Sequence, residues 1–221
     1  MKNRTAIVFG GTGLVGRALI DELVKSDDYD VIKIFIRSRI SIQEASKIIT
    51  FVVDFDNIDS FSKDITGDDL FICIGTTIKK AGSVKRMEEI DRDLPVKISA
   101  IASGNGVRNV AVVSSIGANA GSANYYLRIK GEMEKGISDQ DFESVAILRP
   151  SLLLGEREEQ RMGEKAGKIM MKFLGIFMIG KLRKYRGIEG RSVAKAMLHF
   201  VSKSKGPVVY ESDILQKIAD Q

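Results

Sequence analysis

The sequence predicts an α/β protein, a doubly wound parallel sheet followed by a small C-terminal lobe. Six short apolar runs, mostly β-branched or aromatic, alternate with segments whose apolar positions recur every three or four residues. A glycine-rich loop joins the first run directly to the first of these segments. Strands that alternate with helices build a parallel sheet with right-handed crossovers and helices on both faces.

Each expected element follows from its own pattern. The six runs are apolar on both faces, as strands covered on both sides must be, and they occupy residues 5–9, 31–36, 49–54, 70–74, 110–114 and 145–148. An apolar stripe predicts helices over residues 14–25, 95–105 and 126–137. Beyond Pro150 the pattern becomes helical and rich in Met and Lys, and residues 208–210 and 214–219 predict an edge strand and a closing helix. We therefore expect one domain over residues 1–221, with a sheet core at about 1–150 and a small lobe at about 151–221.

Composition narrows the class of protein. The 221 residues are 44% hydrophobic and 29% charged, which suits one globular domain, and a net charge of +5 is too small to predict nucleic-acid binding. The single cysteine, Cys73, excludes a disulfide framework and favours a reducing compartment, so we expect a cytoplasmic protein. The single histidine, His199, excludes a multi-histidine metal site, and we expect no metal. The longest apolar stretch, residues 169–179, is broken by Lys172 and is too short to span a bilayer, so we expect no membrane partner.

The loop between the first strand and the first helix carries four glycines within seven residues. A plain strand–turn–helix corner is the alternative, but it needs only one glycine. In a Rossmann-type domain one glycine allows the tight turn, one admits a pyrophosphate close to the backbone, and one lets the helix pack near the sheet. The exposed N–H groups and the helix dipole then favour the phosphates. We expect this loop to bind a dinucleotide through Gly10, Thr12, Gly13, Leu14, Val15 and Gly16.

The end of the second strand indicates which dinucleotide fits. An acid about 20 residues after the last glycine would hold the ribose 2′-hydroxyl of NAD. That count from Gly16 reaches Ile36 and Arg37, where the sequence has no acid. An arginine can instead hold a 2′-phosphate, so Arg37 favours NADP as the cofactor of this NAD(P)-binding domain. The alternatives are an ordinary loop cation at Arg37 and NAD as cofactor.

A tyrosine and a lysine four residues apart on a helix share one face and can transfer a proton together. The sequence holds two such pairs. Tyr29 and Lys33 straddle the start of an expected strand, where this spacing is not one helical turn. Tyr126 and Lys130 open an expected helix just after the strand that ends near Ser115, where ligands bind in such sheets. The alternative is a half-buried aromatic residue and a solvated charge.

Several stretches together resemble the short-chain dehydrogenase/reductase superfamily, and in particular its atypical, epimerase-like branch typified by the human Tat-interacting protein of 30 kDa. The first three are the GGTGLVG loop, Ser115 at the strand end and the pair of Tyr126 and Lys130. Further similar stretches are residues 52–55, 73–77, 80–82, 91–93, 114–119, 126–134 and 148–164. The resemblance covers roughly residues 5–200, and its specificity comes from the order of motifs that are individually loose.

The resemblance implies catalytic roles for three residues. Tyr126 would donate a proton to a carbonyl, Lys130 would hold the nicotinamide ribose and assist that transfer, and Ser115 would hydrogen-bond the substrate oxygen. Ser114 is the less favoured candidate for the last role. The interval from Ser115 to Tyr126 is slightly shorter than is usual in the superfamily.

The resemblance also implies further cofactor contacts. Asp54 and Phe55 would border the adenine. The ribose and phosphates would be lined by Gly75, Thr76 and Thr77, and the nicotinamide by Pro150 and Leu152. The expected function is therefore an NADP-dependent oxidoreductase that reduces the carbonyl of a small-molecule substrate.

Two alternatives remain open at this point. One is a nucleoside-diphosphate-sugar epimerase with tightly held NAD, against which Arg37 and the small lobe count. The other is a non-catalytic dinucleotide sensor that binds a partner through the basic residues 181–186. The apolar and basic segment over residues 168–187 favours a lobe helix that caps the active site, and the alternative is an interfacial membrane helix or a partner-binding surface. The sequence does not indicate an oligomeric state.

Overall fold

A seven-stranded parallel sheet forms the centre of the molecule in the computed structural model, which describes residues 4–38, 45–155 and 180–221. The strand order is β3-β2-β1-β4-β5-β6-β9. The strands are β1 Arg4–Phe9, β2 Tyr29–Ile36, β3 Ile48–Val52, β4 Asp69–Ile72, β5 Asn109–Val113, β6 Ser144–Arg149 and β9 Gly206–Glu211. This arrangement confirms the predicted doubly wound α/β fold.

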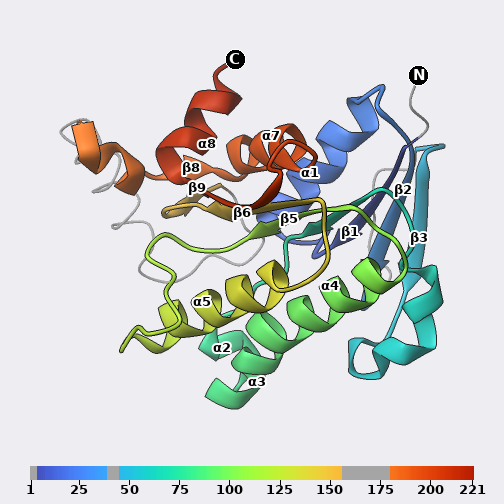
Figure 1. Ribbon diagram of the computed structural model, residues 1–221, viewed down its shortest axis with the longest axis horizontal. Helices are drawn as coiled ribbons and strands as arrows, with labels where there is room; N and C mark the ends of the chain where they lie inside the picture. Colours follow the sequence, from blue (N-terminus) through green and yellow to red (C-terminus); the bar gives the residue numbers. More distant parts are fainter. Residues whose placement is uncertain (1–3, 39–44, 156–179) are drawn as a thin grey trace.

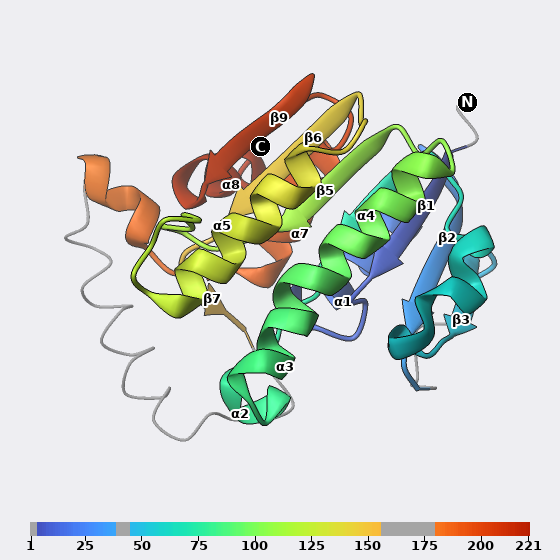
Figure 2. The same cartoon turned by 60° about the horizontal axis from the view of Figure 1, so that its bottom comes forward.

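Helices cover both faces of the sheet. Figure 1 shows α1 Leu14–Lys25, α7 Gly190–Phe200 and α8 Ser212–Ala219 above the sheet. Below it lie α4 Leu94–Gly104 and α5 Tyr125–Ser138, which Figure 2 brings to the front. The smaller elements are η1 Phe55–Asp64, α2 Ile78–Ala81, α3 Val84–Glu88, the π-helical turn η2 Glu89–Asp93, β7 Leu153–Leu154, η4 Gly180–Tyr185 and β8 Ile188–Glu189.

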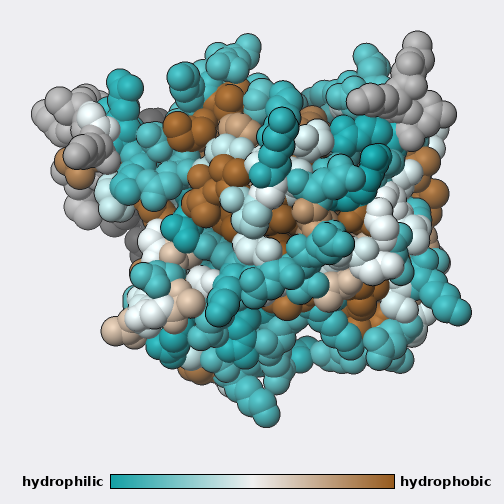
Figure 3. Space-filling model, viewed as in Figure 1, coloured by the Kyte–Doolittle hydropathy of each residue, from teal (hydrophilic) through white to brown (hydrophobic). Residues whose placement is uncertain are grey.

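The central strands bury both of their faces, which explains their unbroken apolar sequence. In β1, Ala6 and Val8 belong to the apolar cluster beneath α1 and α7. Ile7 and Phe9 point the other way, into the cluster with α4 and α5. The outward sides of the helices are polar, and Figure 3 shows hydrophilic residues over most of one face, with hydrophobic patches among them.

The predicted elements are present with ends that differ by a few residues, including the edge strand β9 and the closing helix α8. The expected division near residue 150 needs a correction, because β9 joins the main sheet and α7 and α8 pack on it. These elements complete the sheet core instead of forming a separate lobe. The apolar part of the proposed capping segment, residues 168–179, lies outside the described residues. Among the helices that are described, none has the length and apolarity needed to cross a bilayer.

A buried polar cluster joins the amino-terminal ends of four strands, β1, β2, β4 and β5. The carboxylate of Asp69, which is 0% exposed, accepts hydrogen bonds from the Tyr29 hydroxyl at 2.6 Å and the Asn109 amide at 2.9 Å. Arg4 forms an ion pair with the same carboxylate at 2.5 Å. Burial is the main cause that raises the pKa of Tyr29, and the neighbouring charge of Asp69 raises it further. Tyr29 therefore stays protonated and donates its hydrogen bond to Asp69.

Asp69→Asn is expected to lower the free energy of unfolding by about 2 kcal/mol, because a partly buried cation and two donors lose their charged acceptor. Urea denaturation of wild type and variant measures the difference. Asp27→Asn, at an exposed position, is the matched control and should change stability little. Equal stability of the Asp69 variant and wild type would contradict this account of the cluster.

Candidate functional site

The predicted site residues gather at one edge of the sheet. Because the strands are parallel, the loops that follow them all open at their carboxyl ends, which is where ligands bind in such sheets. The glycine loop follows β1, Arg37 follows β2, Asp54 and Phe55 follow β3, Gly75, Thr76 and Thr77 follow β4, Ser115 follows β5, and Pro150 and Leu152 follow β6.

Two glycines of the loop are required by the fold itself. Gly10 has a φ of +81°, and a Cβ there would lie 2.5 to 2.7 Å from backbone atoms of Cys73 and Ile74. A Cβ on Gly16 would lie 2.2 Å from the carbonyl oxygen of Gly10. These close approaches bring the start of α1 against the first turn and seat the loop on the end of β4.

Gly13 is different, because the fold leaves room around it. A Cβ there would have the Gly10 carbonyl oxygen as its nearest neighbour in the described chain, at 3.4 Å, and its φ of −80° suits any residue. Gly13 is the N-cap of α1 and makes no side-chain cap bond, so the first N–H groups of the helix lack that acceptor. The open space and these donors fit a bound phosphate group.

A depression of about 420 Å³ lies at the ends of β2 and β3. Its lining residues are Arg37, Val52, Val53, Asp54, Phe55, Asp56 and Arg86. The structure thus brings Arg37 together with Asp54 and Phe55, as the dinucleotide interpretation requires. It also places the carboxylates of Asp54 and Asp56 in this depression, although the chain has no acid directly beside Arg37. Counting residues to the end of β2 could not reveal acids that follow the neighbouring strand, β3.

The helix α5 positions Tyr126 and Lys130 one turn apart. The Asn124 side chain caps it by accepting the Leu127 N–H at 3.2 Å. Tyr126 is 38% exposed, whereas Lys130 is 3% exposed. The loop after β5 lies directly on this helix, since a Cβ on Gly131 would come within 2.2 Å of the Ala120 nitrogen.

The two serines at the end of β5 differ in their surroundings. The Ser114 hydroxyl donates to the carboxylate of Glu134, which also binds Arg149 through two contacts at 2.5 and 2.9 Å. The Ser115 hydroxyl has only a long contact within the described chain, 3.5 Å to the Ile116 carbonyl. This difference favours Ser115 over Ser114 as a substrate-binding hydroxyl.

Asp91 belongs to one of the similar stretches, residues 91–93, but the sequence assigned it no role in the site. Its carboxylate is 0% exposed and lies 3.3 Å from the Lys130 ammonium. It also accepts the Thr76 N–H, at 3.1 and 3.2 Å to its two oxygens. Asp91 lies in the π-helical turn η2, and such turns are frequent at functional sites. The side chain therefore links the loop after β4 to the Lys130 side chain on α5.

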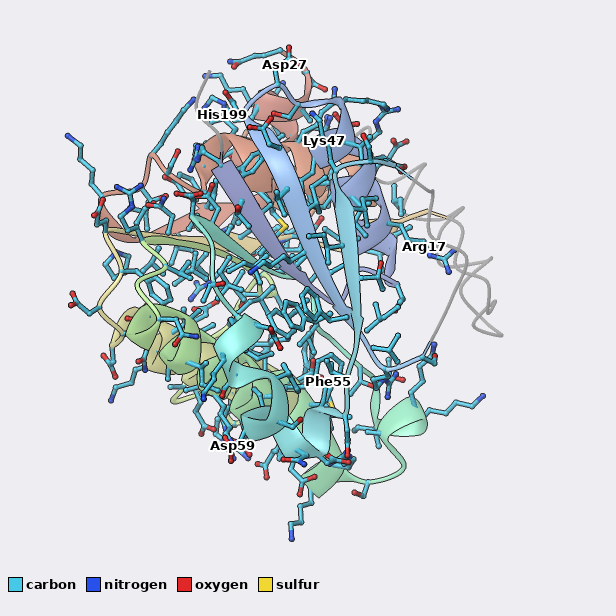
Figure 4. All side chains as sticks on the ribbon, turned by 90° about the vertical axis from the view of Figure 1, so that its right-hand side faces the viewer. Arg17, Asp27, Lys47, Phe55, Asp59 and His199 are labelled. Carbon is cyan, nitrogen blue, oxygen red and sulfur yellow. The ribbon has the colours of Figure 1, made fainter. Side chains whose placement is uncertain are left out.

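Cys73 and His199 stand apart from this chemistry. Burial raises the pKa of the Cys73 thiol to about 12, so it remains protonated. Burial, together with the nearby charge of Lys203, lowers the pKa of His199. Figure 4 shows His199 among the helices on one side of the sheet and Phe55 toward the helices on the other. Within the described ranges no cluster of three or more His, Cys, Asp or Glu side chains suits a metal ion.

Comparison with known proteins identifies the family. A family model described as NAD(P)H-binding matches residues 10–172. The chain belongs to the NAD(P)H-binding family. This confirms the resemblance to the atypical short-chain dehydrogenases/reductases and the expectation of a nicotinamide cofactor.

Relatives of this NAD(P)H-binding chain include proteins of similar length. Protein HTATIP2 of Rattus norvegicus is 30% identical over 178 residues, which cover 79% of this chain and 72% of the relative. Protein FMP52, mitochondrial, of Eremothecium gossypii is 30% identical over an alignment of 224 positions, which covers 98% of each chain.

Solved structures support the fold alone, because their identities to this chain are low. The UDP-N-acetylglucosamine 4-epimerase of Methanobrevibacter ruminantium M1 has a TM-score of 0.70 at 16% identity, over 96% of this chain and 77% of its own. The oxidoreductase ylbE of Lactococcus lactis has a TM-score of 0.63 at 16% identity, over 98% of this chain and 97% of its own.

The residues present fit the NAD(P)H of this family. The space at Gly13 and the N–H groups of α1 suit a pyrophosphate, and the depression with Phe55 suits an adenosine. Asp91 joins Thr76, in the loop after β4, to Lys130 on α5. A nicotinamide held at this edge supplies or accepts a hydride.

Proposed function

We propose that the protein is an NADP-dependent oxidoreductase that reduces the carbonyl of a small-molecule substrate. The observation that carries this proposal is the arrangement around α5. Tyr126 and Lys130 lie one turn apart on this helix, and the loop that holds Ser115 packs against it at the ligand-binding edge of the sheet.

Each of the three side chains has a proposed role. Tyr126, which is 38% exposed, donates its hydroxyl proton to the carbonyl oxygen as the oxygen gains negative charge. Ser115 donates a hydrogen bond to the same oxygen, for which its hydroxyl is available. Lys130, fixed by Asp91, binds the cofactor ribose beside Tyr126. Pro150 and Leu152, which follow β6, border the nicotinamide.

The proposed preference for NADP rests on Arg37, which lines the adenosine depression. NADPH should bind more tightly than NADH by about 1 to 3 kcal/mol, the range for a charge-assisted contact. Arg37→Asp should reverse the preference, because the new carboxylate repels a 2′-phosphate and can accept a hydrogen bond from a 2′-hydroxyl. Calorimetric titration with both cofactors measures this. Equal affinities of wild type for NADPH and NADH would mean that Arg37 does not bind the 2′-phosphate.

A second candidate is a dinucleotide-binding protein without turnover. The buried pair of Asp91 and Lys130 favours it, because the carboxylate at 3.3 Å compensates the charge of the lysine. In this candidate the pair serves as a structural link. A nucleotide-sugar epimerase is the remaining alternative, with Arg37 still counting against its use of NAD.

Oxidation of NADPH in the presence of aldehydes, ketones and quinones tests the proposed function. Turnover of one substrate class would support the oxidoreductase. Tight NADPH binding with no turnover across the panel would favour the non-catalytic candidate. Mass spectrometry of nucleotide that co-purifies with the protein identifies the cofactor independently of any substrate.

The proposed location is the cytoplasm, on the basis of the single cysteine, Cys73. The FMP52 relatives carry the word mitochondrial in their names. Fractionation of the source cells with an antibody against this protein distinguishes the two locations.

A further inference from the structure

Arg37 shares the adenosine depression with a second arginine that comes from a different part of the fold. Arg86 lies on α3, beyond β4, and lines the same depression of about 420 Å³. Neither the position of Arg86 in the sequence nor a spacing rule connects it with the end of β2. The topology alone brings the two arginines to one depression.

The scaffold fixes the element that carries Arg86. The Ser83 hydroxyl accepts the Arg86 backbone N–H at 3.0 Å and caps α3. The Tyr125 hydroxyl donates to the Val84 carbonyl at 3.0 Å and ties α3 to α5. The guanidinium of Arg86 therefore extends from a helix that is anchored on both sides.

Asp56 holds this guanidinium in the structure. Both oxygens of the Asp56 carboxylate contact Arg86 Nη2, at 2.8 and 3.1 Å, while Arg86 Nη1 binds Glu89 at 2.9 Å. The Arg86 and Asp56 side chains are 43% and 66% exposed. An ion pair so exposed to water contributes little net stability, so a phosphate can replace Asp56 at low cost.

The two acids of the depression are not equivalent. The Asp54 carboxylate accepts the Asp56 backbone N–H at 3.0 Å, so it is committed to the start of η1. The Asp56 carboxylate instead forms an ion pair with Arg86. Asp56 is therefore the acid whose removal frees Arg86 Nη2, while Glu89 stays on Nη1 and the Asp54 cap of η1 stays in place.

We propose that Arg86 and Arg37 together bind a phosphomonoester, the 2′-phosphate of NADP, and that Asp56 weakens this binding by competing for Arg86. This inference rests on the proposed dinucleotide function and adds to it a second specificity-determining cation and an opposing acid. Two guanidinium groups on one dianionic phosphate form charge-assisted hydrogen bonds that a 2′-hydroxyl cannot replace.

The test uses adenine nucleotides, so it requires neither substrate nor turnover. The probes are 2′,5′-ADP, its regioisomer 3′,5′-ADP and 5′-AMP, with NADPH and NADH alongside, titrated by calorimetry. Arg86→Gln should lower the affinity for 2′,5′-ADP and NADPH by at least about tenfold, the equivalent of one charge-assisted hydrogen bond. The same variant should keep its affinity for 5′-AMP and NADH within about twofold of wild type.

Asp56→Asn should act in the opposite direction and raise the affinity for 2′,5′-ADP and NADPH by about threefold to tenfold.

A matched control separates the site from net charge. Lys85→Gln removes one positive charge from the neighbouring position on α3, outside the lining of the depression, and should leave all five affinities nearly unchanged. Retained NADH binding shows that each variant is folded. Circular dichroism provides a second check of the fold.

Three results would overturn the inference. In the first, Arg86→Gln binds 2′,5′-ADP as tightly as wild type does. In the second, Asp56→Asn binds 2′,5′-ADP no more tightly than wild type. In the third, wild type binds 2′,5′-ADP and 3′,5′-ADP equally. If the variants have no effect while wild type binds both dinucleotides, the inference fails and the proposed function stands. If wild type binds 2′,5′-ADP but neither dinucleotide, the phosphate site stands and the proposed function fails.

Discussion

Gly13→Val is expected to abolish dinucleotide binding and leave the protein folded. A valine at this N-cap has room in the fold, since the nearest described atom to its Cβ would be 3.4 Å away and the backbone is extended. The same side chain fills the space in which phosphate oxygens would approach the backbone. Saturating NADPH, at 100 times its dissociation constant, should stabilise wild type by about 2.7 kcal/mol and the variant not at all. Thermal unfolding with and without NADPH measures both effects.

Two other glycines are the controls for this experiment. Gly104→Val, at the exposed end of α4 with open space around its Cβ, should remain folded and bind NADPH normally. Gly16→Val should instead destabilise the protein itself, because its Cβ would lie 2.2 Å from the Gly10 carbonyl oxygen. Equal stabilisation of wild type and Gly13→Val by NADPH would mean that the phosphates bind elsewhere.

The fold could be predicted because its signals are local. Each central strand is buried on both faces, so its sequence is apolar without a break, as in β1. The end of the chain was harder to assign. Whether β9 joins the main sheet depends on its register with β6, such as the pairing of Ala146 with Val208, and this register leaves no separate pattern in the sequence.

The candidate site could be predicted in part, for a similar reason. Gly13, Tyr126 and Lys130 lie in motifs whose spacing reflects one loop or one helical turn. Asp91 lies in one of the similar stretches, residues 91–93, but that stretch indicated no role for it, and Arg86 lies in none of them. The topology alone brings their partners to them. Asp91 meets Lys130 across 39 positions of the chain, and Arg86 meets Asp56 across 30.

The buried link through Asp91 also bears on how binding and chemistry are connected. The same carboxylate holds the Thr76 N–H, where the cofactor phosphates are expected, and the Lys130 ammonium beside Tyr126. The loop after β4 and Lys130 therefore share one buried partner, Asp91. Whether this lysine assists a proton transfer or only supports the fold is decided most directly at its neighbour, Tyr126.

Tyr126→Phe is expected to lower the rate of NADPH oxidation by two or more orders of magnitude, a typical span for the loss of general acid catalysis. The substitution removes only the hydroxyl of a side chain that is 38% exposed, so fold and cofactor affinity should stay nearly unchanged. The measurements are turnover with a carbonyl substrate from the panel and NADPH affinity by calorimetry. Tyr125→Phe is the matched control on the same helix: it removes the exposed hydrogen bond that ties α5 to α3, so it measures how far a loosened scaffold alone lowers turnover. The control should keep turnover within about threefold of wild type, as expected for a hydroxyl outside the chemistry. Full activity of Tyr126→Phe would exclude Tyr126 as the acid, and equal losses in both variants would indicate a disturbed helix instead of lost proton transfer.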